Sequence, residues 1–83
     1  MKLDDATYIE ISKFNFEMLE ILEEKREKKK DTWKDCYVSL LLKALKHQVG
    51  EFENLLYSKE YKRKKLLHIA NYCFFLYQRL GEI

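Results

Sequence analysis

Apolar residues recur at intervals of three and four along most of the chain, which is the spacing of one face of an α-helix. In the first third of the sequence this repeat consists of Tyr8, Ile11, Phe14 or Asn15, Met18 and Leu22. Asp4 or Asp5 stands where a helix N-cap is expected, and basic residues gather at the other end of the segment. Because acidic groups favour the start of a helix and basic groups its end, the pattern predicts a first helix over residues 5–28.

The same spacing continues in the middle of the chain and predicts a second helix over residues 36–57. Its repeat is carried by Val38, Leu41, Leu45, Val49, Phe52 and Leu56. Gly50 lies inside this segment, where a glycine costs about 1 kcal/mol relative to alanine. Gly50 therefore either permits the close approach of a neighbouring backbone or occupies an exposed position that tolerates it.

A third helix is predicted over residues 60–80. Its apolar seam consists of Leu66, Ile69 or Ala70, Cys73, Leu76 or Tyr77, and Leu80. Ser58 can cap its start, and Gly81 stands where a C-cap glycine is expected. The turn at residues 57–59 is short, so the second and third helices should be antiparallel neighbours.

These elements predict an all-α fold in which residues 1–83 form a single domain, an antiparallel three-helix protomer. The sequence has no Pro and only two Gly, which favours a few long helices. The second and third helices each carry two apolar faces, more than so short a chain can cover by itself. We therefore expect a homodimer, or a larger homo-oligomer, in which a second copy completes the helical bundle.

Residues 31–35 interrupt the helical pattern and are interpreted as a connection. Trp33 in this connection is either a lid on the end of the bundle or part of a binding mouth, and the lid is favoured because Trp usually buries most of its ring. Cys36 and Cys73 form no Cys-x-x-Cys motif. Cys73 falls on the third apolar seam and is expected to be a small buried hydrophobe; a disulfide is the less favoured alternative in an intracellular chain.

The formal net charge of +2 is too small to indicate a nucleic-acid-binding protein. The basic clusters at residues 25–34 and 59–65 are expected at opposite ends of the protomer, as solvated and partly paired surfaces. No apolar run approaches the length of a membrane span, and no signal peptide is recognisable, so we expect an intracellular, cytoplasmic protein without a membrane partner.

Six polar residues lie beside the apolar stripes of the second and third helices: His47, Gln48, Glu51, Lys65, His68 and Asn71. If these helices pack side by side, the six side chains can face one another, as in the ligand sites of helix bundles. His47 and Glu51 share a helix face, and with His68 they could bind a transition metal such as zinc. The alternative is that the histidines form local hydrogen bonds.

Three short motifs carry a resemblance to a known family: the Lys-x-x-Asp-Thr-Trp-Lys connection of residues 28–34, Val49-Gly50-Glu51, and Ile69-Ala70-Asn71-Tyr72. Through them, the region from about Lys28 to Leu80 resembles the MazG-like, all-α nucleotide pyrophosphohydrolase superfamily. The resemblance implies a helical dimer or tetramer that holds Mg²⁺ with acidic side chains and splits a nucleoside triphosphate into monophosphate and pyrophosphate. It also makes Trp33, Lys65, Asn71 and Tyr72 candidate phosphate or nucleotide contacts.

The acidic residues that this family uses are mostly replaced. The family pattern places Glu-Glu-x-x-Glu on one helix and Glu-x-x-Asp on the next. The first two glutamates fall on His47 and Gln48, and the second acidic pair falls on Lys65 and His68; Glu51 alone keeps its carboxylate. Since Mg²⁺ prefers several oxygen ligands, the family's cofactor is poorly supported by the residues present.

Three hypotheses follow. The first, which we favour, is a catalytically degenerate nucleotide-binding or assembly module. The second is an active pyrophosphohydrolase in which His47, Glu51 and His68 hold a softer metal while Lys65 binds phosphate. The third is a small nucleic-acid-binding protein that uses its basic ends.

Overall fold

Three α-helices and one short 3₁₀ helix form the part of the chain that the computed structural model describes, residues 2–29, 32–54 and 56–82. Helix α1 spans Asp5–Lys29, the 3₁₀ helix η1 spans Thr32–Asp35, α2 spans Val38–Phe52, and α3 spans Lys59–Gly81. These described ranges contain no β-strand. The prediction of an all-α, three-helix chain is therefore confirmed.

The boundaries of α1 and α3 lie within one residue of their predicted positions, whereas α2 is shorter than predicted. It starts after Tyr37, whose backbone is extended (φ −65°, ψ 144°). It ends at Phe52, because Asn54 Oδ1 then accepts a hydrogen bond from the Leu56 backbone N–H at 2.9 Å. Such a local bond from an asparagine side chain competes with continued helix, so the extension of this helix to residue 57 was wrong.

The predicted N-caps are present, but the predicted C-cap is not. Asp4 Oδ1 accepts a hydrogen bond from the Thr7 backbone N–H at 2.7 Å, and Ser58 Oγ accepts one from the Tyr61 N–H at 3.2 Å. Each bond satisfies a backbone donor that has no partner within the first helical turn. Gly81 instead remains helical, and Glu82 follows it with right-handed dihedral angles (φ −86°, ψ −8°).

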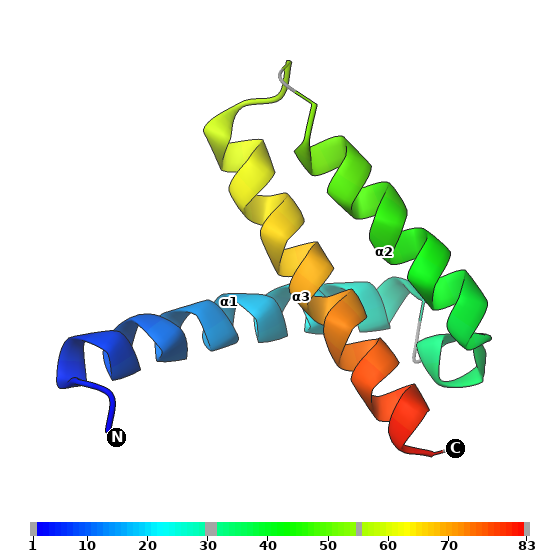
Figure 1. Cartoon of the computed structure of the whole chain (residues 1–83), viewed down its shortest axis with the longest axis horizontal. Helices are drawn as coiled ribbons and strands as arrows, with labels where there is room; N and C mark the ends of the chain where they lie inside the picture. The colour runs from blue at the N-terminus through cyan, green and yellow to red at the C-terminus, as the bar shows by residue number, and fades with distance from the viewer. Residues whose placement is uncertain (1, 30–31, 55, 83) are drawn as a thin grey trace.

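Helices α2 and α3 form an antiparallel hairpin, as the short turn predicted (Figure 1). Helix α1 crosses this hairpin instead of lying along it, and it packs on α3 through its C-terminal half. The N-terminal half of α1 projects beyond the hairpin, so that the starts of α1 and α3 lie far apart (Figure 1). One surface of α1 is therefore only partly covered within the chain.

The apolar core is small and gathers where α1, η1 and the hairpin meet. Among the described residues, the buried apolar side chains are Ile21, Leu41 and Phe75. The Trp33 ring stacks on Phe75, with centroids 4.8 Å apart and planes 13° apart. Tyr72 meets the same Phe75 ring edge-on at 5.6 Å. Trp33 thus covers the end of the core, in agreement with its interpretation as a lid.

Several residues predicted to be buried are exposed in the chain. Cys73 is exposed and both cysteines are free, so the prediction of a buried Cys73 was wrong for the protomer. Leu66, Tyr77 and Leu80 of the predicted seam are exposed as well. An added Cβ at Gly50 would meet nothing within 4 Å, so no neighbouring backbone approaches it. No helix of the described residues is long and apolar enough to cross a membrane.

We predict that Phe75→Ala destabilises the protein by about 3 kcal/mol, because it removes a buried ring and the surface on which Trp33 stacks. Urea denaturation followed by circular dichroism measures this change. Tyr37→Ala is the matched control, since this side chain is 75 % exposed. A similar loss in both variants would show that Phe75 is not a centre of the core.

Candidate functional site

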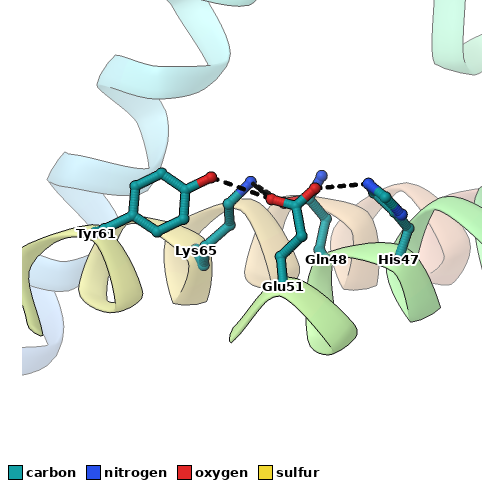
Figure 2. Close-up of polar contacts among 5 residues, drawn as sticks. All are labelled: His47, Gln48, Glu51, Tyr61 and Lys65. Atoms are coloured by element: carbon teal, nitrogen blue, oxygen red, sulfur yellow. Dashed lines mark hydrogen bonds and ion pairs between the residues drawn. The ribbon is translucent and has the colours of Figure 1, made fainter. Parts of the chain in front are cut away.

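The carboxylate of Glu51, near the end of α2, is shared by three neighbours (Figure 2). His47 Nε2 lies 2.6 Å from Glu51 Oε1, and Lys65 Nζ lies 2.5 Å from Oε2. The Tyr61 hydroxyl donates a hydrogen bond to Oε2 at 3.1 Å. His47 and Glu51 are one helical turn apart on α2, and Tyr61 and Lys65 are one turn apart on α3. The antiparallel pairing of the two helices brings these pairs together.

Lys65 is the most enclosed charge of this group, since its side chain is only 12 % exposed. Its ammonium also donates a hydrogen bond to Gln48 Oε1 at 3.0 Å and lies 5.1 Å from the Tyr61 ring centroid. Burial opposes the charged form, but the hydrogen bonds and charges of Glu51 and Tyr61 raise the pKa of Lys65 above its usual value. The cation is therefore held between an anion, an amide oxygen and an aromatic face.

The neighbours of Glu51 stabilise the ionised form of its carboxylate. The hydrogen bond from Lys65 is the largest effect on Glu51 and lowers its pKa. Burial comes second and opposes this change, while the Tyr61 hydrogen bond and the charges of Lys65 and His47 add smaller lowering effects, so the pKa is lowered overall. The carboxylate is thus ionised and surrounded by donors. We name His47, Gln48, Glu51, Tyr61 and Lys65 the interhelical cluster. Its geometry suits a clamp between α2 and α3.

The prediction that polar side chains of α2 and α3 meet is confirmed for Lys65, which contacts both Gln48 and Glu51. His68 and Asn71 do not join this group. Both line a pocket of about 160 Å³ together with Trp33 and Tyr72. Among the described residues, no three His, Cys, Asp or Glu side chains are placed to hold one metal ion. His47, Glu51 and His68 are therefore not brought together as a ligand set.

The pocket is lined by aromatic, aliphatic and polar side chains. Leu22, Leu41 and Phe75 contribute to its walls, and Lys25 and Arg26 also line it. Asn71 is 4 % exposed, and its Nδ2 donates a long hydrogen bond to the Met18 carbonyl at 3.5 Å.

Two buried polar atoms in this pocket, Asn71 Oδ1 and His68 Nδ1, have no hydrogen-bond partner among the described residues. A buried polar atom without a partner costs about 1–3 kcal/mol. Burial, followed by the positive charges of Lys25, Lys65 and Lys64, lowers the pKa of His68 to about 4. The imidazole is therefore neutral at pH 7, and its Nδ1 can either donate or accept a hydrogen bond, depending on the tautomer.

Tyr61 was not among the candidate site residues of the sequence, although its hydroxyl donates a hydrogen bond to Glu51. Its position one turn before Lys65 is a signal that could have found it, because residues four apart share a helix face. The contributions of Lys25 and Arg26 to the pocket carried no comparable signal. They depend on the angle at which α1 crosses α3, which local sequence does not encode.

No protein-family model, curated protein or solved structure matches this chain. The resemblance to the MazG-like superfamily therefore stays a prediction.

We predict that Glu51→Gln and Lys65→Met each lower the thermal midpoint by several degrees, because each leaves a polar partner unpaired between the helices. The double variant should lose less than the sum of the two, because the contact is already gone after the first change. Thermal unfolding at pH 7 measures this coupling. Strict additivity would contradict the clamp.

The pH dependence of the same contact has a defined sign. Because the pKa of Glu51 is lowered on folding, its stabilisation is complete above the ordinary glutamate pKa and is lost as the pH falls through the lowered value.

His68 should make the protein less stable in mild acid. Between pH 6.5 and about 4, the unfolded chain protonates this imidazole while the folded chain does not, so stability falls as the pH decreases. Because the ring is only partly buried, solvent screens much of the effect, and we expect about 1 kcal/mol. Urea unfolding at pH 7.5 and pH 5 should show a smaller pH difference for His68→Gln than for the original chain. An unchanged difference would contradict the shifted pKa.

Proposed function

We propose that this chain is a catalytically degenerate, MazG-like helical module that acts by assembling with copies of itself. The observation that carries the proposal is the state of the Glu51 carboxylate, which is bonded to Lys65, His47 and Tyr61. A divalent cation at Glu51 would lie beside the Lys65 ammonium and would find no second carboxylate from the motif positions. Since Mg²⁺ binds oxygen ligands and tolerates few cationic neighbours, this arrangement favours a structural role.

The amount of exposed surface supports the assembly part of the proposal. A compact monomer of 10.2 kDa is expected to expose about 5,300 Å². This chain exposes 7087 Å², and its exposed apolar side chains occur on α1, α2 and α3. Exposed apolar surface on this scale is typical of protein–protein contacts. A homodimer or larger homo-oligomer would remove it from water.

We predict that light scattering of the purified chain gives a mass of at least twice 10.2 kDa at micromolar concentration. The physical reason is that so small a core is marginal in a chain of this length, and a second copy would add the missing apolar burial. A particle of one chain mass, still fully helical at that concentration, would refute the assembly proposal.

Nucleotide binding is a second candidate function, favoured by the pocket at the junction of α1, η1 and α3. Trp33, Asn71 and Tyr72 were candidate nucleotide contacts, and all three line this pocket. An aromatic wall can stack a base, and Asn71 Oδ1 can accept from a base N–H. Lys65 lies in the interhelical cluster instead and does not line the pocket, so the arrangement does not support its role as a phosphate contact.

The single tryptophan, Trp33, provides a direct test of this second candidate. Titration with nucleoside mono- and triphosphates, with and without Mg²⁺ or Mn²⁺, should change its fluorescence without release of pyrophosphate. Asn71→Ala should weaken binding by about tenfold, as expected for the loss of one hydrogen bond, whereas the exposed Asn15→Ala should not. Pyrophosphate release that disappears in Glu51→Ala would overturn the degenerate-site proposal.

A further inference from the structure

One face of α3 is apolar, regular and uncovered. Its members are Leu66, Ala70, Cys73, Tyr77 and Leu80, which we name the α3 stripe. Their spacing of four, three, four and three places them on a single helix face, as in the seam of a coiled coil. Within the chain, Leu66 is 43 %, Tyr77 76 % and Leu80 57 % exposed, and Cys73 is exposed as well. A seam of this kind is the surface that a second helix covers.

The neighbours of α3 within the chain occupy other faces of the helix. Asn71 faces α1, where it bonds to the Met18 carbonyl, and the buried Phe75 on the same side of α3 stacks on Trp33 of η1. Lys65, which bonds to Gln48 and Glu51, lies on the side toward α2. At 100° per residue, the α3 stripe lies away from both of these sides. Most of the stripe is therefore left open by α1 and α2, although Ala70 is half-buried and Leu66 lines a hollow with Phe14 of α1.

The distribution of charged residues along α3 also indicates that the α3 stripe is a protein–protein contact. Residues 59–65 include five Lys or Arg residues, whereas residues 66–78 contain no Asp, Glu, Lys or Arg at all. Depletion of charge at the centre, with charged residues at the margin, is the composition of a protein–protein contact. A nucleic acid or an acidic peptide would instead require the positive charge to lie along the stripe.

The α3 stripe is complementary to itself when two copies run antiparallel. Its order is nearly symmetric about Cys73, so Leu66 would lie opposite the partner's Leu80. Ala70 would lie opposite the partner's Tyr77, and a small residue leaves room for a large one. Cys73 would meet the partner's Cys73 on the two-fold axis. Self-complementarity of this kind is the requirement for an isologous dimer.

We infer that α3 is the self-association helix of this protein, and that a second copy covers the α3 stripe in an antiparallel α3–α3 pair centred on Cys73. The inference rests on the proposed assembly and specifies its surface. The chain as a whole, α1 included, exposes about 1,800 Å² more than a compact monomer of its mass, so an interface that buries roughly 800 Å² per partner is within the surface that the fold leaves open.

A second exposed apolar surface, on α1, is less suited to the same pairing. Residues 2–24 include seven acidic and only two basic residues. An antiparallel α1–α1 pair would bring Asp4 and Asp5 close to the partner's Glu23 and the partner's Glu24. Like charges at such contacts oppose association. The α3 stripe has no charged residue at its centre and avoids this conflict.

Cysteine cross-linking tests the inference directly. In Cys36→Ser, Cys73 is the only thiol, and mild oxidation of the folded protein should give a disulfide-linked dimer, because the two Cβ atoms would lie within bonding range. The dimer should not form in 8 M urea at the same concentration. The matched control, Cys73→Ser, retains Cys36 and should remain monomeric on a non-reducing gel. Equal cross-linking of both variants would overturn the inference.

Two further variants in a cysteine-free background, Leu66→Cys and Leu80→Cys, test whether the two α3 helices run antiparallel. Mixed together, they should cross-link to each other. Neither should cross-link to itself, because residues 66 and 80 are about 21 Å apart along a helix. Self-linking of each variant alone, without mixed products, would indicate a parallel pair and overturn the antiparallel arrangement.

A charge placed on the stripe should break the pair. We expect Tyr77→Asp to weaken dimerisation at least tenfold in sedimentation equilibrium, whereas Tyr37→Asp should leave it unchanged, since Tyr37 is equally exposed but lies outside the stripe. Helicity by circular dichroism reports whether each variant folds.

The results also separate this inference from the broader proposal. If the oligomer persists in Tyr77→Asp but dissociates in Phe16→Asp, the α3 pair is refuted while the assembly proposal still holds. A monomeric original chain would refute both.

Discussion

The contact between the Glu51 carboxylate and the Lys65 ammonium joins the two helices on which the rest of the chain is built. It links α2 to α3 at 2.5 Å, and Gln48 and Tyr61 supply the remaining hydrogen bonds. A partly enclosed ion pair of this kind contributes less through its net energy than through the penalty for separating it. It therefore fixes how the hairpin pairs. The same donors surround the Glu51 carboxylate, so its structural role would compete with the binding of a metal ion.

The second constraint is the crossing of α1 over α3. Near the C-terminal half of α1, Trp33 and Phe75 close a small core at the junction, and the pocket forms beside them. This crossing places Asn71 and His68 in a largely apolar pocket, where their unpaired atoms are costly and the imidazole stays neutral. The interhelical cluster and the pocket are thus two separate polar sites. The charged groups of the cluster bond to one another, whereas two atoms of residues that line the pocket, His68 Nδ1 and Asn71 Oδ1, have no hydrogen-bond partner among the described residues.

The same geometry explains the large exposed surface. An 83-residue chain arranged as a hairpin with a crossing arm has fewer internal faces than three parallel rods, so apolar side chains remain outside on each helix. Burial of apolar surface is the main driving force for folding, and a second copy can supply what one chain lacks. Association and folding would then be linked, and the stability of the fold would depend on protein concentration.

The sequence by itself determined the local features of this protein: the three helices, the caps at Asp4 and Ser58, the antiparallel hairpin, and the facing of Gln48 and Glu51 with Lys65. The helices and caps follow from helical periodicity and from hydrogen bonds between residues close in sequence, and the pairing of the hairpin follows from the short turn between α2 and α3. Only the tertiary structure decided that His68 lies apart from Glu51 and that Leu66 and Cys73 are exposed. The physical reason is that periodicity shows which residues share a helix face, whereas long-range packing decides which of several apolar faces is covered.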